Sequence, residues 1–454
     1  MSYETAVAGI YALGHELANT PSQKFDLAHM RVLLAALGHP EWRFPGVLIA
    51  GTNGKGSTAA TLASILKASG VRTGLYTSPH LVRINERIRI SSEPISNEDF
   101  AELHERVDRI SEQLLRRSEL PWHPSFFEML TAIAFEHFAR EKVEIAVLEV
   151  GMGGRLDATN VIEPRLTVIT DISLDHQKFL GNTVAEIASE KAGIIRPGIP
   201  VVTLPQQPAA NDVIGNRILE LGALAINAVP YVPAISPAAS SVRYEVSTDG
   251  NNVTSWFSRY PLQVMGKEVV VETPLVGRHQ LRNVALAIAA AEELSTQGIS
   301  VTPDSIEEGI RETHWPGRFQ VTAAGKGRPE IVFDVAHNPA GAWALRSTLS
   351  SCYEDWPLTL VFGAMRDKAI GEMAEILFPL AERVIATRAD NPRSATAQDI
   401  RDAAARTSVE IYEAPGVLAA LTEAREFAGE KGLVVVTGSI YIVGEAMRHL
   451  GVRI

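Results

Sequence analysis

The feature that most constrains how this chain folds is the run VLIAGTNGKGST at residues 47–58. A short apolar strand enters a glycine-rich turn, and the turn opens a helix with one apolar face that stops at Gly70. Glycines allow backbone N–H groups to converge on an anion, and the start of the helix adds its positive end. Lys55 supplies a full charge for the outer phosphates of a nucleotide. The run therefore predicts a phosphate-binding loop between a strand and a helix.

One detail departs from the ordinary phosphate-loop pattern. In that pattern the lysine is followed directly by Ser or Thr, whereas Gly56 intervenes here. Ser57 and Thr58 are then both candidates to offer a hydroxyl to Mg²⁺. A plain glycine-rich turn is the alternative interpretation, but the strand–loop–helix context that the motif demands favours the phosphate loop.

The length and charge of the chain limit the classes of protein it belongs to. At 454 residues it is long enough for two or three domains. Its formal net charge of −11 argues against a nucleic-acid or anionic-membrane partner, because both require a basic face. A single cysteine, Cys352, excludes an internal disulfide and a thiolate metal cluster. With no signal peptide at residues 1–11 and no apolar run of about 20 residues, we expect a cytoplasmic protein.

Three polar residues follow predicted strands, at the edge where open α/β sheets bind ligands. Ser78 is one candidate metal ligand, although a Ser before Pro is more often only a turn residue. Glu149 ends the apolar strand at 145–151, and burying an unpaired carboxylate is costly. A role as Mg²⁺ ligand is therefore favoured over a structural salt bridge. For His176, after the strand at 166–172, a ligand role and a structural role are equally open.

Cations elsewhere have ordinary interpretations when taken alone. Arg83, Arg87 and Arg89 indicate a solvated charged face, with anion steering as the sharper alternative. Lys191, near the end of a helix, is by its pattern only a cation that suits the helix dipole. Neither set identifies a site without further information.

Alternating strands and helices predict an α/β fold with two domains. We expect a phosphate-loop-type ATPase domain with a parallel sheet over residues 1–298, and a smaller Rossmann-like α/β domain over residues 299–454. Period-2 stretches at 242–246 and 269–271 flank Asp249-Gly250 and predict a small antiparallel β appendage on the first domain. The strands expected in the second domain are residues 331–335, 358–362, 384–386 and 434–436.

Eight motifs in one order resemble the folylpolyglutamate synthase/dihydrofolate synthase family, amide ligases of the Mur type. A single motif would be weak, whereas eight over nearly the whole chain are highly specific. They include Gly56, which this family uses in its phosphate loop. The motifs are GTNGKGS at 51–57, SPHL at 78–81, EVG at 149–151, GGRLDATN at 153–160, DH at 175–176, EKAG at 190–193, PGRF at 316–319 and DVAHNP at 334–339.

The resemblance implies an ATP-dependent ligase that uses Mg²⁺, and it assigns roles to several residues. Lys191 matches the family's carboxylated lysine, and the expected catalytic residues are Lys55, Lys191 and His337. The expected ATP-binding residues are Asn53, Gly54, Lys55, Gly56, Ser57, Asn283, Arg318 and Asp334. The expected Mg²⁺ ligands are Ser57, Ser78, Glu149 and His176. The expected glutamate-binding residues are His337, Ser439 and Tyr441.

The resemblance also implies a pterin site and two activities. The expected pterin-binding residues are Ser22, Gln23, Lys24, Phe25, Ser125, Phe126, Phe127, Glu128, Leu156, Asp157 and Ala158. The implied substrates are ATP, L-glutamate and either dihydropteroate or a reduced folate such as tetrahydrofolate, and a monomer is expected. Glutamate would be added through an acyl-phosphate intermediate. The alternative is folylpolyglutamate synthase activity without dihydrofolate synthase activity.

Two rival interpretations fit the sequence less well. A muramyl ligase needs a UDP-binding N-terminal domain, and fewer than fifty residues precede the phosphate loop in the sequence. A phosphate-loop regulatory switch has no need of polar strand ends in a second domain. Glutamate-dependent phosphate release would exclude the switch.

Overall fold

The computed structural model describes residues 1–14, 26–234, 243–248, 254–322, 328–452 and 454. The predicted pterin residues Ser22, Gln23, Lys24 and Phe25 and the Asp249-Gly250 turn lie outside these ranges. The chain forms two compact units. The first unit comprises Met1–Val232, Gln263–Val269 and Arg282–Glu312, and the second comprises Pro233–Leu262, Val270–Leu281 and Thr313–Ile454.

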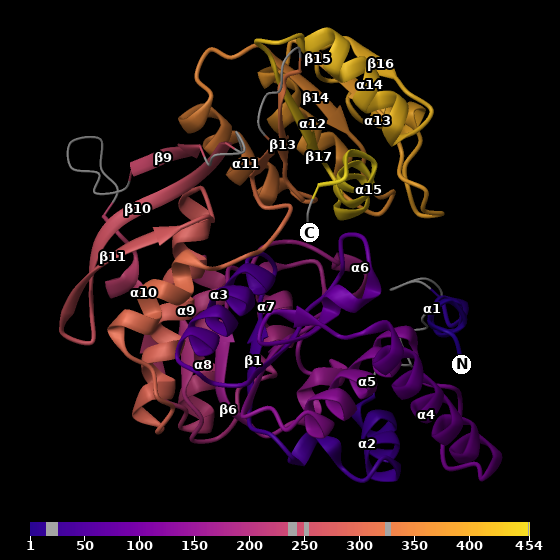
Figure 1. Cartoon of the computed structure of the whole chain (residues 1–454), viewed down its shortest axis with the longest axis vertical. Helices are drawn as coiled ribbons and strands as arrows, with labels where there is room; N and C mark the ends of the chain where they lie inside the picture. The colour runs from indigo at the N-terminus through magenta and orange to yellow at the C-terminus, as the bar shows by residue number, and fades with distance from the viewer. Residues whose placement is uncertain (15–25, 235–242, 249–253, 323–327, 453) are drawn as a thin grey trace. The chain divides into compact units, whose positions relative to one another are not determined.

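The first unit is built on an eight-stranded sheet with the phosphate-loop strand inside it (Figure 1). In spatial order the strands are β4 (Glu93–Pro94), β3 (Ile88–Ile90), β2 (Thr73–Tyr76), β5 (Ile145–Glu149), β1 (Gly46–Ala50), β6 (Pro164–Ile169), β7 (Val201–Thr203) and β8 (Ala225–Asn227). In this spatial order, the strands from β2 through β5, β1, β6 and β7 to β8 are parallel to their neighbours. At the other edge, β3 pairs antiparallel with β2, and β4 pairs antiparallel with β3. Strand β1 pairs with both β5 and β6, so the loops after these three strands meet at one edge.

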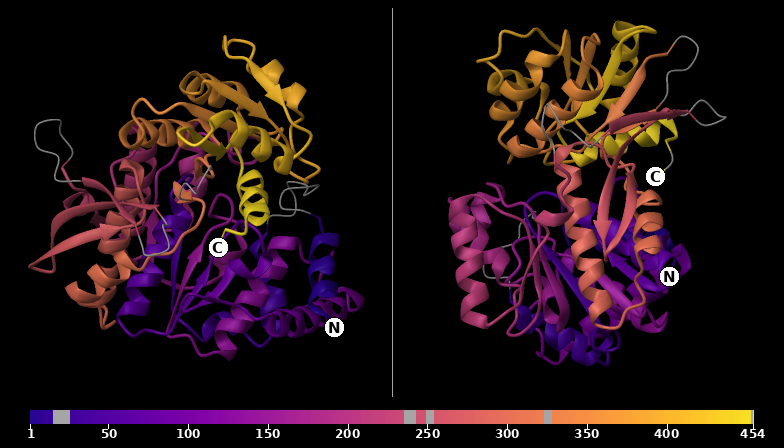
Figure 2. Two further views of the ribbon diagram at one scale, coloured as in Figure 1. Left: turned by 45° about the horizontal axis from the view of Figure 1, so that its top comes forward. Right: turned by 90° about the vertical axis from the view of Figure 1, so that its left-hand side faces the viewer.

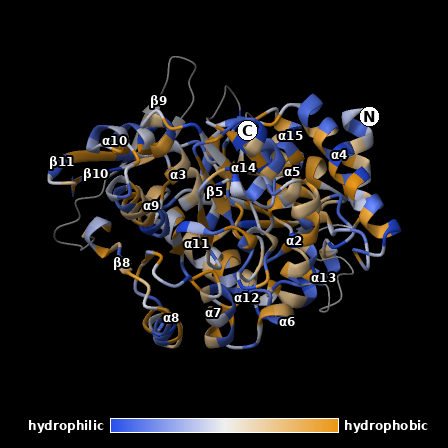
Figure 3. Cartoon of the chain, turned by 90° about the horizontal axis from the view of Figure 1, so that it is seen from below, coloured by the Kyte–Doolittle hydropathy of each residue, from blue (hydrophilic) through white to orange (hydrophobic). Residues whose placement is uncertain are grey.

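Helices lie on both sides of this sheet, as the two views of Figure 2 show. They are α1 (Tyr3–Ala12), α2 (Leu27–Ala36), α3 (Lys55–Ala68), α4 (Asn97–Arg116), α5 (Phe126–Arg140), α6 (Gln177–Leu180), α7 (Val184–Ala192), α8 (Pro208–Leu221), most of α9 (Arg278–Thr296) and α10 (Pro303–Arg311), with short 3-10 turns η2 (Pro40–Trp42), η3 (Ile84–Arg87), η4 (Ala158–Val161) and η5 (Val229–Tyr231). Every residue of β1 and β5 is buried, which explains their unbroken apolar sequences. Helix α4 instead carries both blue and orange residues in Figure 3, because only one of its faces is buried.

A three-stranded antiparallel sheet has the order β11 (Lys267–Thr273), β10 (Thr254–Val264) and β9 (Arg243–Thr248). The small antiparallel sheet expected from the sequence is therefore present, with the unpredicted strand β10 at its centre. The prediction attached it to the first domain, whereas its residues are divided between the two units. Trp256 on β10 donates a hydrogen bond to the Tyr353 hydroxyl of the second unit at 2.9 Å, which ties that end of the sheet there.

The second unit contains a six-stranded sheet that is parallel except for its first strand. In order the strands are β12 (Gln320–Thr322), β13 (Glu330–Phe333), β17 (Leu433–Thr437), β14 (Leu358–Phe362), β15 (Arg383–Ala386) and β16 (Ile411–Glu413). The associated helices are α11 (Pro339–Cys352), α12 (Ile370–Leu377), η6 (Phe378–Leu380), α13 (Ala397–Ala403), α14 (Val417–Ala428) and α15 (Ile440–Leu450). The four predicted strands are all present, and β12 and β16 are additional. The predicted α/β fold class is confirmed.

None of the helices in the described part of the chain has the length and apolar character that a bilayer-spanning helix needs.

Candidate active site

The predicted phosphate loop lies between β1 and α3. Gly54 has a φ of 89°, a left-handed conformation that glycine adopts without strain, and it immediately precedes the first residue of α3. Gly54 has no side chain to cap the helix, so the first N–H groups of α3 have no partner within the helix. Lys55 folds back over the loop, and its Nζ donates to the carbonyl oxygens of Gly51 and Thr52, both at 3.1 Å. A helix start of this kind is suited to bind phosphate.

The loop is held from one side by the segment after β6. The backbone N–H groups of Thr52 and Asn53 donate to the Asp171 carbonyl at 2.8 and 3.1 Å. The Thr52 hydroxyl donates to the Ser173 carbonyl at 3.0 Å, and the Asn53 side-chain amide donates to the Ser173 hydroxyl at 3.1 Å. Asn53 therefore positions the loop in addition to any contact it makes with a nucleotide.

Helix α9 holds the loop from another side. A Cβ placed on Gly54 would lie 2.1 Å from Oδ1 of Asn283, so only glycine fits here while Asn283 keeps its position. Arg282, the preceding residue, donates from Nε and Nη2 to the Asp171 carboxylate at 2.6–3.2 Å. The sequence reasoning missed both partners of this pair. The signal that was available is that Asp171 follows a buried strand, just as Glu149 ends one.

Lys191 comes to the same loop from α7. Its side chain is buried, and Nζ donates to the Gly51 carbonyl at 2.7 Å. Burial, together with the positive charge of Lys55, lowers the pKa of Lys191 from 10.5 to about 7. The interpretation of Lys191 as an ordinary helix-end cation is therefore wrong, because its side chain is buried and bonded to the loop and not solvated at a helix end. The loop carbonyl of Gly51 accepts from two lysine side chains.

The glycine-rich segment after β5 packs against the end of α7 and so positions Lys191. A Cβ on Gly154 would lie 2.9 Å from the carbonyl oxygens of both Glu190 and Lys191. The next residue, Arg155, donates its backbone N–H to the Glu190 carbonyl at 2.8 Å and forms an ion pair with the Glu190 carboxylate. The two motifs GGRLDATN and EKAG thus form one packed unit.

Two of the expected Mg²⁺ ligands lie together. Glu149 is buried at the end of β5, and its Oε2 accepts the backbone N–H of Ser78 at 3.1 Å. Glu149 is also paired in the sheet with Ile49 of β1, two residues before the loop. Carboxylate and hydroxyl oxygens are ligands that Mg²⁺ prefers, so these residues fit the ion.

The structure separates the two hydroxyl candidates on α3. The Thr58 hydroxyl lies 3.4 Å from the Asn283 carbonyl, to which it donates, whereas Ser57 is one residue closer to the start of the helix. This arrangement favours Ser57. His176 has a φ of 50° and lies just before α6, three residues after the Ser173 that contacts the phosphate loop. Its backbone N–H is fixed by the Asp175 carboxylate at 2.8 Å.

The expectation of a solvated arginine face after Ser78 is wrong for two of the three residues. Arg87 and Arg89 are 2% and 8% exposed. The Arg87 guanidinium lies over the Phe126 ring at 5.3 Å and donates from Nε to Nδ1 of His80 at 2.8 Å. Because Nδ1 of His80 accepts this hydrogen bond, it carries no proton, and the ring is neutral. Burial and the Arg87 charge accordingly hold the pKa of His80 well below 6.5. These arginines have partners inside the protein, and the residues around them in the sequence do not reveal those partners.

Both polar side chains of the predicted pterin segment at 125–128 form hydrogen bonds within the protein. Ser125 Oγ accepts the Glu128 N–H at 3.3 Å, and Glu128 Oε2 accepts the Ser125 N–H at 2.8 Å, which forms a capping box on α5. Phe126 is buried, whereas Phe127 is partly exposed and packs against Gly151 in the glycine-rich segment. Phe127 is thus the residue of this set that combines an apolar face with access to solvent.

Asp157 also acts within the fold. Its buried carboxylate accepts the backbone N–H groups of Met152 and Thr159 at 3.0 Å and the Thr159 hydroxyl at 2.6 Å. Burial raises its pKa, although these hydrogen bonds oppose the shift. Its neighbours differ, since Leu156 is partly exposed and Ala158 is buried. Of the three, Leu156 is accessible.

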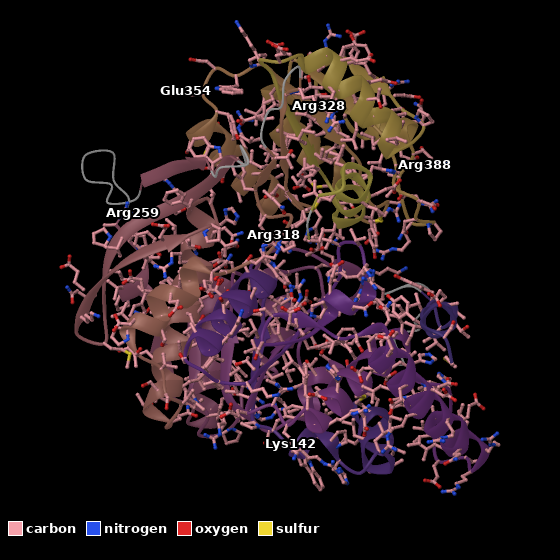
Figure 4. The ribbon with its side chains drawn as sticks, viewed as in Figure 1. Lys142, Arg259, Arg318, Arg328, Glu354 and Arg388 are labelled. Atoms are coloured by element: carbon pink, nitrogen blue, oxygen red, sulfur yellow. The ribbon has the colours of Figure 1, made fainter. Side chains whose placement is uncertain are left out.

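In the second unit the PGRF and DVAHNP motifs are neighbours. The Asp334 carboxylate is buried after β13 and accepts the backbone N–H groups of Phe319 and Ala336 at 3.0 and 2.9 Å. Burial raises the pKa of Asp334, while the Arg318 charge lowers it. Arg318, labelled in Figure 4, lies with its guanidinium 5.9 Å from the Trp315 ring centre. The turn that carries Arg318 is therefore fixed by Asp334.

The three expected glutamate-binding residues belong to adjacent strand ends. His337 follows β13, Ser439 and Tyr441 follow β17, and these two strands pair in parallel. The Gly438 N–H donates to the Ala336 carbonyl at 3.1 Å, which joins the two loops. His337 Nδ1 lies 3.0 Å from the Val335 carbonyl, so Nδ1 carries the proton. Ser439 caps α15 by accepting the Tyr441 N–H at 3.2 Å.

Two family models match this chain. The Mur ligase middle domain matches residues 127–291, and the Mur ligase glutamate ligase domain matches residues 317–440. A Bacillus subtilis dihydrofolate synthase/folylpolyglutamate synthase is 35% identical over 429 residues, covering 94% of this chain and 95% of that protein.

Solved structures agree over the full length. A Mycobacterium tuberculosis folylpolyglutamate synthase complexed with ADP has a TM-score of 0.85 at 30% identity, covering 100% of this chain and 99% of that one. Escherichia coli FolC in complex with DHPP and ADP has a TM-score of 0.80 at 28% identity, covering 99% and 98%. On these matches, the chain belongs to the dihydrofolate synthase/folylpolyglutamate synthase family of Mur-type ligases.

Proposed function

We propose that this chain joins L-glutamate to a pterin-linked carboxylic acid by an amide bond, with cleavage of ATP. The observation that carries the proposal is the uncapped start of α3, where Lys55 adds a positive charge beside helix N–H groups that have no partner within the helix. In a chain with a net charge of −11, this local concentration of positive charge is where a triphosphate would be neutralised.

ATP would bind with its phosphates along residues 53–57. Lys55 would exchange its loop carbonyls for phosphate oxygens, and Asn283, packed against Gly54, would contact the nucleotide. In the second unit, Arg318 would supply further positive charge from the turn that Asp334 fixes. These residues position and neutralise the phosphates, which is the main protein contribution to phosphoryl transfer.

Ser57, Ser78, Glu149 and His176 would hold Mg²⁺. When bound, the ion would neutralise charge on the phosphates. The three oxygen donors suit Mg²⁺, while an imidazole is a less typical ligand for it. Replacing Glu149 with Gln keeps the Ser78 hydrogen bond but removes the charge. This change should raise the Mg²⁺ concentration needed for activity.

Lys191 would react with carbon dioxide to form a carbamate. The neutral amine attacks the carbon of CO₂, and one proton leaves as the N–C bond forms. A pKa of about 7 makes a large fraction of the amine neutral at neutral pH, which supports the proposal. The resulting anion, at the Gly51 carbonyl, would help to hold the cations around the phosphates. Carbon-13 NMR with labelled bicarbonate should show a carbamate signal that the Lys191→Met variant lacks.

The chemistry would proceed in two steps. An oxygen of the substrate carboxylate attacks the γ-phosphorus of ATP, and ADP leaves, giving an acyl phosphate. The glutamate amine then attacks the acyl carbon, and the tetrahedral state collapses with loss of phosphate and one proton. His337, with Nδ1 committed to the Val335 carbonyl, would meet the incoming glutamate together with Ser439 and Tyr441. His337→Ala should impair amide formation more than ATP affinity.

The pterin acid would bind along residues 125–128 and 156–158. Phe127 and Leu156, which are partly exposed, would contact the ring, and Ser125, Glu128 and Asp157 would maintain the shape of the segments. Residues 22–25 complete the expected set. We propose that both dihydropteroate and tetrahydrofolate are accepted, as the double name of the Bacillus subtilis relative suggests.

A phosphate-release assay tests this function directly. Purified protein is given ATP, Mg²⁺ and L-glutamate with dihydropteroate or with tetrahydrofolate, and glutamate is then omitted. Release that requires glutamate with both acids supports the proposal. Release with tetrahydrofolate but not with dihydropteroate would indicate folylpolyglutamate synthase activity without dihydrofolate synthase activity. Absence of glutamate-dependent release with either acid would overturn it.

We also propose how the chain is organised for this task. Residues 1–298 would bind ATP and the pterin acid, and residues 299–454 would act as the glutamate-ligase domain. In support of this division, the middle-domain model (127–291) lies within the first range and the glutamate-ligase model (317–440) within the second. We further propose that the chain acts as a monomer. The cytoplasm, where ATP and glutamate are abundant, is the proposed compartment.

A further inference from the structure

A buried histidine joins two helices beside the proposed pterin segment. His29 on α2 and Glu128 on α5 are 5% and 7% exposed. Nδ1 of His29 lies 3.0 Å from Oε1 of Glu128, and Nε2 lies 3.0 Å from the carbonyl oxygen of Trp122. The Trp122 ring also stacks on the imidazole, with ring centres 5.5 Å apart.

Both partners of this imidazole are hydrogen-bond acceptors. A carboxylate and a carbonyl oxygen have no proton to donate, so each ring nitrogen must carry one. A neutral imidazole has only one N–H and would leave one buried acceptor facing a lone pair. The geometry therefore assigns His29 as an imidazolium ion paired with Glu128.

The same carboxylate continues into the start of α5. Its second oxygen, Oε2, accepts the Ser125 N–H at 2.8 Å, so one side chain connects His29 to the capping box. Between Ser125 and Glu128 lie Phe126 and Phe127, the aromatic residues of the proposed pterin segment. Loss of the imidazolium would leave Glu128 buried without its counter-charge.

We propose that protonated His29 is a positioning residue for the acyl substrate, and that its deprotonation weakens pterin binding while ATP binding is unaffected. The inference rests on the proposed function in that it takes residues 125–128 as part of the pterin site. His29 itself touches neither substrate in this proposal. It acts through Glu128 on the first turn of α5.

The charges around His29 set the direction of its pH dependence. Burial lowers the pKa of His29, but the Glu128 hydrogen bond and charge, the Trp122 carbonyl and the Asp26 charge outweigh it, and the pKa rises above 6.5. Elements η4 and α4 also pack on α2, but the charged groups with the largest effect on His29 are Glu128 of α5 and Asp26 at the start of α2. A raised pKa means that the pair stabilises the fold at lower pH and is lost as pH rises through the folded-state pKa.

The test measures the KM values for dihydropteroate and for ATP from pH 6 to pH 9. In the unmodified protein we expect the dihydropteroate KM to rise above the His29 pKa, approaching about tenfold per pH unit. The ATP KM will itself vary with pH, because Lys191 at the phosphate loop has a pKa of about 7. That dependence should be the same in the unmodified protein and in the His29 variants, and kcat at saturating dihydropteroate should change less than KM. His29→Arg keeps a permanent charge with several donors, so its dihydropteroate KM should lose the rise.

Two further variants complete the design. His29→Gln is neutral at every pH, so its dihydropteroate KM should be high and pH-independent. His123→Gln is the matched control, because His123 also bridges a carbonyl, of Pro124, and a carboxylate, of Asp108, yet is partly exposed and does not contact Glu128. It should retain the unmodified profile.

Three outcomes would overturn the inference. They are a dihydropteroate KM that stays flat in the unmodified protein, a His29→Arg variant that keeps the rise, or a His29 variant that changes the ATP KM by the same factor as the dihydropteroate KM. Failure of the proposed function looks different, since no glutamate-dependent turnover would then be seen with any pterin acid. In that case, proton NMR titration of the His29 ring still reports whether the pKa of His29 exceeds that of free histidine.

Discussion

Two helices of the first unit begin in opposite ways, and both starts belong to segments for which we propose a binding role. Helix α3 begins at Gly54, which offers no capping side chain, so its first N–H groups are free for an anion. Helix α5 begins at Ser125, and the side chains of Ser125 and Glu128 satisfy its first turn. The open start is suited to bind a ligand by its backbone, whereas the closed start serves as a frame for neighbouring side chains. A motif residue can therefore be essential for binding without touching the ligand.

The largest effect should come from the charge at the open start. Lys55→Ala removes the cation that the triphosphate needs, and glutamate-dependent phosphate release should fall by about 10³-fold or more. Lys67→Ala, in the exposed last turn of the same helix, should be close to normal. Near-normal turnover in Lys55→Ala would mean that the open start does not bind the phosphates.

The second prediction tests why the open start must be glycine. Gly54→Ala places a Cβ against Asn283 Oδ1 and also strains a φ of 89°, so ATP affinity should fall about tenfold or more, at 1.4 kcal/mol per tenfold. Gly70→Ala is matched, because Gly70 has a φ of 77° but open space around it. Calorimetric titration with ATP should separate the two. Equal loss of affinity would show that backbone strain alone is responsible.

A third prediction concerns Lys191, which contacts the open start through Gly51. With its pKa at about 7 in the folded chain against 10.5 ordinarily, the unfolded chain binds an extra proton between these values. The free energy of unfolding should therefore rise with pH in this window, by at most about 1.4 kcal/mol per unit, relative to Lys191→Met. Denaturant titrations in CO₂-free buffer measure this difference. Parallel pH curves for the two proteins would contradict the lowered pKa.

The smallest effect is expected at the closed start. Ser125→Ala removes a capping side chain and should cost about 1 kcal/mol of stability. If the capped start of α5 positions the neighbouring pterin-binding side chains, the dihydropteroate KM should also rise several-fold while the ATP KM stays unchanged. Ser96→Ala supplies the control, because Ser96 caps α4 by accepting the Asp99 N–H at 2.9 Å. A similar loss of stability without any change in KM is expected there.

Much of the fold could be predicted because a long segment with a regular apolar pattern can be identified as a helix or a strand from its own residues. The buried strands β1 and β5 and the second α/β unit all follow from apolar patterning. Strand β10 was missed because its sequence offered no clear alternation, and β12 and β16 are only three residues long. Short strands depend on their neighbours more than on their own residues.

The site was predicted less evenly than the fold. The roles of Gly54 and Lys55 could be predicted because both belong to a short motif between a strand and a helix. The low pKa of Lys191, in contrast, results from burial by residues that are distant in the sequence. The Asp171–Arg282 pair joins segments far apart in the chain, and nothing in either segment signals the other. Arg87 and Arg89 seemed surface residues because their internal partners appear only in three dimensions.

The contact between Gly54 and Asn283 has a consequence for how this sequence can vary. The amide of Asn283 occupies the volume that a methyl group at position 54 would need, so the two positions share one space. We therefore expect a side chain at position 54 to be accommodated only with a smaller residue at position 283. A double change, Gly54→Ala with Asn283→Gly, should thus restore room for the loop while leaving the nucleotide without its amide partner.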